Sequence, residues 1–169
     1  MAEFNIRKIG SKDNAEVERL IRDCLIEYGA DHEGTAWADP MLGRLSEVYK
    51  DREPFACYWV ALDEKGTIVG SCGIGTLTGE SDVCELQKLY VRKDMRGTGL
   101  GQLLLDHALT FAKLQYRACY LETCENMNRA KRFYEKNGFV RTDISHGDTG
   151  HCACEDRYIK VFVQSRPEE

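Results

Sequence analysis

Three glycines at alternate positions mark the stretch of this chain best suited to bind a ligand. They lie in the segment Arg96-Gly97-Thr98-Gly99-Leu100-Gly101, between a short apolar run and a pattern of apolar residues at helical spacing. Glycines let a backbone turn several N–H groups toward one point, and at a helix N-terminus such a concavity binds anions, most often phosphate. Arg96 adds a full positive charge. The backbone amides of residues 97–101 are therefore predicted to hold a phosphate group.

Other kinds of glycine-rich turn do not fit this spacing. A dinucleotide-binding turn has the pattern G-x-G-x-x-G directly after a strand, whereas these glycines alternate and residues 92–96 separate them from the apolar run. A P-loop ends in Gly-Lys-Ser or Gly-Lys-Thr, which is missing here. A plain strand-to-helix turn, with glycines for tight packing, stays open as an alternative, although it explains neither Arg96 nor the other basic residues nearby.

The run Leu89-Tyr90-Val91 followed by Arg96 to Gly101 resembles the acetyl-CoA motif R/Q-x-x-G-x-G/A of the GNAT superfamily of N-acetyltransferases. A second signature of that family, Asn128-Arg129-Ala130 and then FYEKNGF at residues 133–139, follows in the same order. The likeness covers residues 55–163. It implies that acetyl-CoA is a co-substrate, and that the acetyl group passes directly to a primary amine of a small molecule, amino acid or peptide.

The resemblance also implies roles for residues on both sides of the glycines. The backbone of residues 89–91 is expected to bond the pantetheine arm and to polarise the thioester carbonyl, as an oxyanion hole does. Asn126 and Asn128 are expected CoA contacts, because Met127 stands where the family often has asparagine. Tyr134 is expected to protonate the leaving thiolate. The alternative for Tyr134 is a core aromatic with a satisfied hydroxyl.

An acceptor amine attacks only after it loses its proton, and a lysine-type amine has a pKa of about 10.4 in water. Two glutamates on predicted strands can take that proton, directly or through one water. Glu85 matches the base of histone-type members of the family, and Glu122 matches the base of members that acetylate ribosomal-protein N-termini. Three interpretations stay open at this point: Glu85, Glu122, or deprotonation by neither.

Strands and helices mixed along one chain must position these residues. The patterns favour an α+β fold with a mixed, α/β-type sheet, and the resemblance implies a mostly antiparallel sheet that splays between its fourth and fifth strands, beside about four helices. Predicted strands cover residues 4–9, 55–62, 67–74, 85–91, 118–123, 139–144 and 157–163. Predicted helices cover residues 14–28, 39–50, 100–114 and 126–137. A capping box at 13–16 marks the start of the first helix, and Asp39-Pro40 marks the start of the second. The apolar face of the third helix is expected to consist of Leu103, Leu104, Ala108, Phe111 and Leu114.

Composition limits the classes of protein that fit. With 169 residues, 43% hydrophobic and 30% charged, the chain fits one domain over residues 1–169, with a core at 4–163 and a frayed tail at 164–169. The net charge of −5 argues against nucleic acid as a partner. No apolar run approaches the length of a membrane span and the N-terminus has no signal-peptide core, so we expect a cytoplasmic protein without a membrane partner.

Eight cysteines raise the question of disulfides or bound metal. Without a secretory signal, disulfides are not expected. Cys152 and Cys154 lie near His146, Asp148 and His151, but their spacing matches no zinc pattern. No metal site is predicted, and these ligand-type residues are interpreted as incidental members of a loop.

The acceptor site has the weakest signal. Asp31, His32, Glu33 and Trp37, in a stretch without periodicity, are candidate contacts, as is the loop at 145–156. Each is explained at least as well by a solvated loop or, for Trp37, by packing. The family resemblance is compatible with a homodimer. An acyl-CoA-binding sensor without turnover is the alternative function, and a structural domain without a ligand is a weaker one.

Overall fold

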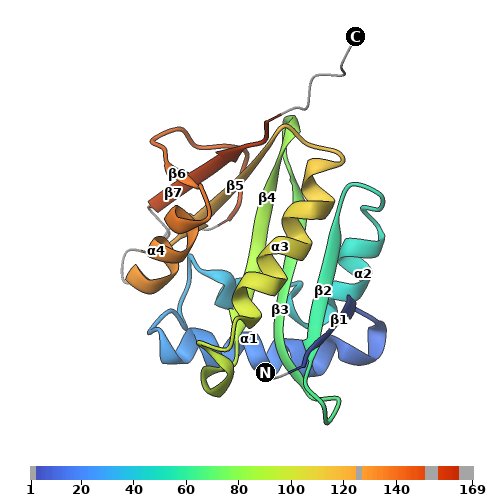
Figure 1. The fold of residues 1–169 in the computed structure, drawn as a ribbon. Coiled ribbons are helices and arrows are strands. Elements are labelled where there is room, and N and C mark those ends of the chain that lie inside the picture. Colours follow the sequence, from blue (N-terminus) through green and yellow to red (C-terminus); the bar gives the residue numbers. More distant parts are fainter. Residues whose placement is uncertain (1–2, 125–126, 151–155, 164–169) are drawn as a thin grey trace.

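Seven strands form one mixed sheet within residues 3–124, 127–150 and 156–163, the ranges that the computed structural model describes. Their order across the sheet is β1-β2-β3-β4-β5-β7-β6, and neighbours are antiparallel except β4 and β5, which are parallel (Figure 1). The predicted α+β fold with a mixed sheet is confirmed. The strands are β1 (Asn5–Lys8), β2 (Cys57–Leu62), β3 (Ile68–Leu77), β4 (Glu80–Val91), β5 (Ala118–Thr123), β6 (Val140–Arg141) and β7 (Asp156–Val161).

Helices cover both faces of the sheet. They are α1 (Asn14–Glu27), α2 (Leu45–Lys50), α3 (Leu100–Lys113) and α4 (Asn128–Lys136). In Figure 1, α3 crosses the face nearer the viewer, whereas α1 and α2 lie behind the sheet. Successive side chains of a strand point to opposite faces, and in β2 Trp59 joins the apolar core with α3 while Tyr58 and Val60 join the core with α1 and α2. Burial of apolar surface on both faces is the main force that holds these layers together.

Strands β4 and β5 separate partway along β4. Their parallel pairing extends only from Val83 to Glu85 on β4 and from Ala118 to Tyr120 on β5. Beyond Glu85, β4 pairs with β3 up to Val91, and the rest of β5 pairs with β7. The sheet is therefore splayed between β4 and β5, as predicted, and the two strand ends diverge instead of sharing a ladder of hydrogen bonds.

The second helix begins at Leu45, later than the predicted start at Asp39. A short 3-10 helix, η3 (Leu42–Arg44), precedes it, and the last residue of η3 has the non-helical angles φ −144° and ψ 39°. The Asp39 carboxylate does not cap a helix. It accepts a hydrogen bond from the Met41 N–H at 2.8 Å and pairs with Lys88 of β4 at 2.8 Å. A contact with a distant strand thus takes the place of the local cap.

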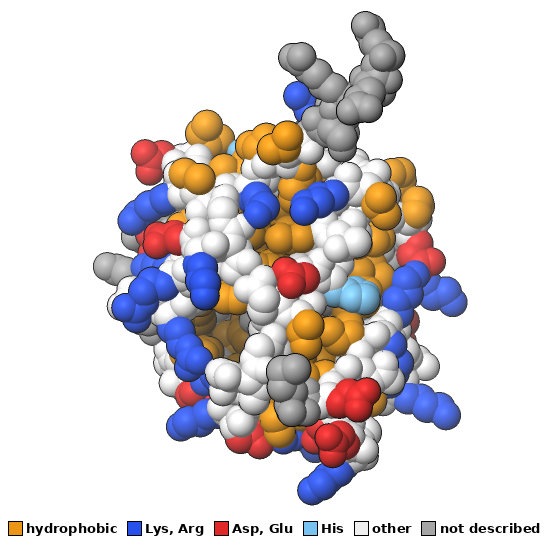
Figure 2. Space-filling model, viewed as in Figure 1, with side chains coloured by type: hydrophobic (Ala, Val, Ile, Leu, Met, Phe, Trp, Pro, Cys, Tyr) orange, Lys and Arg blue, Asp and Glu red, His pale blue; other side chains and the backbone are white. Residues whose placement is uncertain are grey.

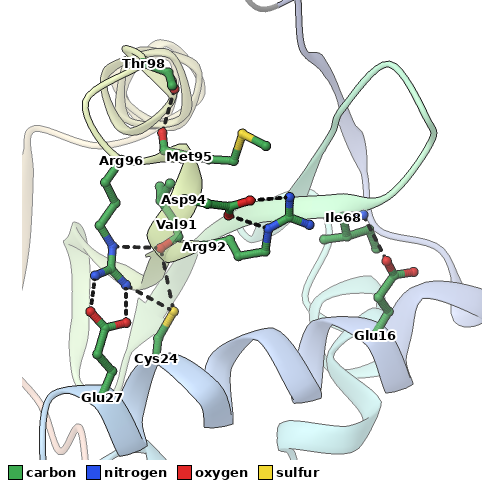
Figure 3. Close-up of polar contacts among 10 residues, drawn as sticks. All are labelled: Glu16, Cys24, Glu27, Ile68, Val91, Arg92, Asp94, Met95, Arg96 and Thr98. Atoms are coloured by element: carbon green, nitrogen blue, oxygen red, sulfur yellow. Dashed lines mark hydrogen bonds and ion pairs between the residues drawn. The ribbon is translucent and has the colours of Figure 1, made fainter.

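The first helix also starts differently from the predicted capping box. Asp13 belongs to a preceding 3-10 helix, η1 (Ser11–Asp13), and its carboxylate accepts from the Gly10 N–H at 2.7 Å, one turn earlier than expected. Glu16 turns instead to β3, where it accepts from the Ile68 N–H at 2.9 Å (Figure 3). Glu16 therefore joins α1 to the sheet rather than to its own first turn.

Three further expectations on elements need correction. Leu103 and Leu114 are exposed, at 48% and 81%, because the helix turns other apolar residues inward. Strand β6 contains two residues, not the predicted 139–144, since the Ile144 N–H bonds to the Thr142 hydroxyl and the chain leaves the sheet. Among the described residues, α4 begins at Asn128. The buried stripe of α3 is Leu100, Leu104, Leu105, Ala108, Leu109 and Ala112.

Within the described ranges, no helix combines the length and apolar character that a membrane span requires.

Candidate active site

A cleft of about 470 Å³ opens where β4 and β5 separate. Its walls come from the second half of β4, the glycine turn, the end of β5, α4 and the end of α1. Figure 2 shows a hollow with a hydrophobic interior between these elements, with Lys and Arg side chains on its α4 side. The structure brings together most of the predicted site residues as lining of this cleft: Glu85, Leu89, Tyr90, Val91, Arg96, Gly97, Gly99, Gly101, Glu122, Asn128 and Tyr134.

Three predicted site residues remain: Thr98, Leu100 and Asn126. The Thr98 hydroxyl donates to the Met95 carbonyl at 2.6 Å and closes the turn. Leu100 is buried in the core, 1% exposed. For these two residues the prediction concerns only their backbone amides, which lie at the start of α3. Asn126 lies outside the described residues.

Gly97 and Gly99 give the turn its shape. Their φ angles are +78° and +90°, in the left-handed region that glycine adopts without strain. A Cβ atom at either position would meet no atom within 4 Å, so the backbone here faces open space. Gly99 is the N-cap of α3, and the first-turn amides of a helix have no acceptor inside it. These donors, the helix dipole and the open space fit a phosphate group, as acetyl-CoA requires.

Arg96 ties this turn to β4 and α1. Its Nε donates to the Val91 carbonyl at 3.0 Å, and its two terminal nitrogens contact the Glu27 carboxylate. The guanidinium carbon lies 5.1 Å from the centroid of the Tyr28 ring, and Nη2 lies 3.8 Å from Cys24 Sγ. Figure 3 shows the guanidinium pointing from the turn toward α1. The hydrogen bonds from Arg96, together with its charge, hold the pKa of Glu27 below the usual range. The geometry supports a role in holding the turn, and direct contact of Arg96 with a diphosphate stays a prediction.

A β-bulge interrupts β4 beside the cleft. Residues 71–73 of β3 stand opposite residues 87–90 of β4, so the bulged strand has one residue more than its partner. Lys88 in this bulge has a φ of +50°, which is uncommon for any residue other than glycine. Its side chain is 8% exposed and pairs with Asp39 at 2.8 Å. The bulge changes the direction of β4 just before residues 89–91, the segment predicted to contact the pantetheine arm and the thioester.

Glu85 is a buried carboxyl group at the point where the pairing of β4 with β5 ends. It is 3% exposed, and burial raises its pKa from 4.5 to about 7. The side-chain amide of Gln87 donates to Glu85 Oε2 at 2.6 Å. This hydrogen bond and the charge of Lys88 oppose the rise in pKa, whereas the charge of Glu122 adds to it. A carboxyl group with a pKa near neutrality suits a general base, which must accept and then release a proton.

Glu122 lines the same cleft, but both of its carboxylate oxygens have donors. The Tyr120 hydroxyl donates to Oε1 at 2.7 Å, and the Thr149 hydroxyl donates to Oε2. The Nε atom of Arg157 lies 3.9 Å from Oε1. Glu122 therefore fastens the segment that carries Thr149 to β5, and these contacts compete with any proton transfer from a substrate.

Tyr134 lies in the wall that α4 contributes. Its ring packs against Phe133 and Phe139, with ring centroids 5.6 and 5.8 Å away. Burial raises its pKa, so the hydroxyl keeps its proton at neutral pH and is able to donate it. Met127, which stands where asparagine was expected from the resemblance, accepts a hydrogen bond from the Thr123 hydroxyl at 3.5 Å through its sulfur.

Some cleft residues were missed by the sequence analysis. Gln87 could have been found from strand alternation, because it lies two residues beyond Glu85 and so on the same face. Lys88 and Tyr28 carry no such signal. The position of Lys88 in the cleft depends on the β-bulge, and that of Tyr28 depends on how α1 meets the glycine turn. Trp37 is not among the residues that line the cleft: its ring lies 4.7 Å from the Arg22 guanidinium carbon and packs against the core, which is the alternative that the sequence left open.

Three other predicted acceptor contacts and the described part of the ligand-type cluster have partners or positions of their own. Asp31, His32 and Glu33 are exposed and do not line it. His146 places Nδ1 2.8 Å from Glu80 Oε1 and packs its ring on Tyr120. No group of three His, Cys, Asp or Glu side chains able to hold a metal occurs among the described residues. The remaining members of the cluster, His151, Cys152 and Cys154, fall outside that part of the chain.

A glycine turn at a helix N-terminus and a buried carboxyl group in one cleft suit an enzyme that uses a phosphate-bearing co-substrate. Residues 54–141 match the family model described as an acetyltransferase (GNAT) domain. The chain belongs to the GNAT family of acetyltransferases, and it is an N-acetyltransferase whose acetyl donor is acetyl-CoA.

Individual relatives agree with this assignment. Uncharacterized N-acetyltransferase YjgM of Escherichia coli is 40% identical over 158 residues, which cover 92% of this chain and 93% of that protein. Peptidyl-lysine N-acetyltransferase YjaB of Salmonella typhimurium is 35% identical over 104 residues, which cover 62% of this chain and 64% of that protein. The PaiA N-acetyltransferase of Thermoplasma acidophilum, solved in complex with coenzyme A, shares the fold with a TM-score of 0.74 at 18% identity, over 95% of this chain and 99% of that one.

Proposed function

We propose that this protein transfers the acetyl group of acetyl-CoA directly to a primary amine, with Glu85 as the general base. The observation that carries the proposal is the position of Glu85. It is a buried carboxyl group with a pKa of about 7, and it lines the same cleft as the glycine turn. A base with a pKa near the working pH combines a useful ionised fraction with enough basicity to take a proton.

Different residues along the cleft bind the donor, take the proton of the acceptor and protonate the leaving group. The amides of residues 97–101 and the dipole of α3 hold the diphosphate of the donor. The backbone of residues 89–91 orients the thioester. Glu85 takes a proton from the acceptor ammonium, the amine nitrogen then bonds to the acetyl carbon, and the carbon–sulfur bond breaks. Tyr134 gives its proton to the departing thiolate, and the second proton that the nitrogen loses as the amide forms returns to Tyr134 through solvent. Glu85 releases its proton to solvent when the products leave.

Glu85 is favoured over Glu122 because of the contacts that each makes. Glu85 accepts one hydrogen bond from Gln87 and faces the charge of Lys88. Glu122 accepts two hydroxyl donors and has the Arg157 guanidinium beside it, so protonation of Glu122 would disturb the contacts that hold β5 to its neighbours.

We also propose that the acceptor is a small amine, an amino acid or a lysine side chain of a peptide. The buried carboxyl groups Glu85 and Glu122 in the cleft suit an acceptor that arrives as an ammonium ion. The name of the YjaB relative supports inclusion of lysine peptides in this set. The cytoplasmic location and the homodimer stay predictions from the sequence.

Release of free CoA thiol with a panel of primary amines tests the proposal, with lysine peptides, amino acids and polyamines each present in turn. We expect turnover with at least one member, a loss of about 10²-fold or more in kcat for Glu85→Gln, and a smaller change for Glu122→Gln. For Tyr134→Phe we expect a lower kcat with unchanged affinity for acetyl-CoA. Binding of acetyl-CoA without turnover for the whole panel, and without an effect of Glu85→Gln, would favour an acyl-CoA sensor and contradict the proposal.

A further inference from the structure

A short chain of hydrogen-bonded polar side chains leads from the cleft to α2. Its three members are Glu85, Gln87 and Tyr49. The Gln87 Nε2 atom donates to Glu85 Oε2 at 2.6 Å, and the Tyr49 hydroxyl donates to Gln87 Oε1. Tyr49 is 4% exposed, and no acyl-CoA motif of the sequence includes it or Gln87. Gln87 also lines the cleft, so these hydrogen bonds connect the cleft wall at Glu85 with α2.

The two hydrogen bonds fix the direction of the Gln87 amide. Burial raises the pKa of Tyr49 well above its ordinary value, so the hydroxyl keeps its proton and can donate it to the amide oxygen. The amide nitrogen then faces Glu85, where it donates to the carboxyl group in either protonation state. The reverse orientation would set the amide oxygen against an ionised carboxylate, which is repulsive.

Two glycines of β3 make room for this chain. A Cβ atom at Gly75 would lie 2.4 Å from Gln87 Oε1, and one at Gly73 would lie 2.7 Å from the Tyr49 hydroxyl oxygen. A Cβ atom does not come this close to another heavy atom, so any larger residue at either position would displace the side chain next to it. The slot for the Gln87 amide is thus built into the sheet itself.

We propose that Gln87 and Tyr49 are positioning residues for the acetyl-transfer reaction, which hold Glu85 by Oε2 in one orientation and leave Oε1 for the acceptor amine. The inference rests on the proposed role of Glu85 as the base. It adds that the base is oriented by the amide of Gln87, and that Tyr49 acts on Glu85 only through this amide.

The other charged and titratable groups around Glu85 do not replace this contact. Lys88 lies on the same strand and its charge lowers the pKa of Glu85, but it pairs with Asp39. From β5, Glu122 raises the pKa of Glu85, and Tyr120, the register partner of Glu85, donates its hydroxyl to Glu122. From α2, Tyr49 makes its hydrogen bond to Gln87.

The pH dependence of kcat/KM tests the inference, measured for wild type, Gln87→Leu, Tyr49→Phe and the control Tyr116→Phe. The control removes another buried tyrosine hydroxyl, one that donates to the Phe55 carbonyl at 2.6 Å outside the cleft lining. Loss of a donor to a carboxylate raises its pKa, so we expect the acid limb of Gln87→Leu to move up by about one pH unit. Tyr49→Phe is expected to move it less, in the same direction, and Tyr116→Phe not at all.

A second readout separates this inference from the proposed function. Titration of the Glu85 side-chain carbon by ¹³C NMR, assigned with Glu85→Gln, reports the carboxyl group whether or not it acts in catalysis. A higher Glu85 pKa in Gln87→Leu supports the inference even if Glu85→Gln remains active, a result that would contradict only the proposed base. An unchanged Glu85 pKa in Gln87→Leu would overturn the inference. If Gln87→Leu does not fold, Gly75→Ala displaces the same amide and the same two outcomes apply.

Discussion

Replacement of Glu85 by glutamine should make the protein more stable at alkaline pH while it removes the base. In the unfolded chain the Glu85 carboxyl group has its ordinary pKa of 4.5, and burial raises the value to about 7 in the folded protein. Below pH 4.5 both states are protonated and the group does not affect unfolding. Between pH 4.5 and 7 the unfolded state loses its proton first, so wild-type stability falls as the pH rises through this window.

The size of this effect follows from the difference between the two pKa values. At about 1.36 kcal/mol for each pKa unit, the difference between 4.5 and about 7 corresponds to about 3 kcal/mol lost by pH 8. Glu85→Gln carries no titrating group and should not show this loss. Relative to its value at pH 4, the free energy of unfolding of the variant should therefore exceed that of wild type by about 3 kcal/mol at pH 8.

Urea unfolding of both proteins at a series of pH values measures this difference. With a urea dependence of about 2–3 kcal/mol per molar for a chain of this size, the midpoints should diverge by about 1 M between pH 4 and pH 8. Comparison with the pH 4 difference removes any pH-independent effect of the substitution. Parallel midpoints over the whole range would show that Glu85 has an ordinary pKa in the folded protein, and the choice of Glu85 as base would lose its physical reason.

Three further substitutions test other parts of the site. Arg96→Gln should weaken acetyl-CoA binding about tenfold in calorimetry. In a Glu27→Gln background the same change should weaken binding less, because the two side chains hold the turn together. Additive effects of the two substitutions on the binding free energy would contradict this coupling. Gly99→Ala should lower the free energy of unfolding, measured in urea, by about 1–2 kcal/mol. The φ of +90° at this position is strained for alanine, while the added Cβ atom would meet no neighbour. Unchanged stability would mean that the turn does not need this conformation. Glu122→Gln removes a like charge that raises the pKa of Glu85, so the acid limb of kcat/KM should move to lower pH; loss of activity at every pH would instead make Glu122 the base.

Much of the fold was predictable because its elements carry strong local patterns. Strand β5 has the predicted bounds 118–123, since a short apolar run there follows directly on a helix. Residues 63–66, between the predicted strands 55–62 and 67–74, form the turn that joins β2 and β3, and the Gly66 N–H bonds to the Asp63 carbonyl at 2.9 Å. The errors arose where a distant contact decides the local structure. The start of α2 depends on the pairing of Asp39 with Lys88, which no local pattern records.

The candidate site, like the fold, was predictable from the sequence only in part. The glycine turn was recognisable because its residues lie close together in the sequence, and the two strand glutamates that line the same cleft were named from the family resemblance. The partners of these residues were not recognisable, because they come from elsewhere in the chain. Glu27 lies 69 residues before Arg96, and Tyr49 lies 38 residues before Gln87. Whether Glu85 or Glu122 is better suited to act as a base depends on burial and on such partners, so the sequence left both open.

A crystal structure of the protein with CoA tests most directly the central claim that one cleft holds both the diphosphate and the reacting end of the donor. We expect the diphosphate on the amides of residues 97–101, the pantetheine arm along residues 89–91 of β4, and the sulfur in the part of the cleft lined by Glu85 and Tyr134. CoA bound at another surface, or a turn at 97–101 that contacts no phosphate, would contradict the claim.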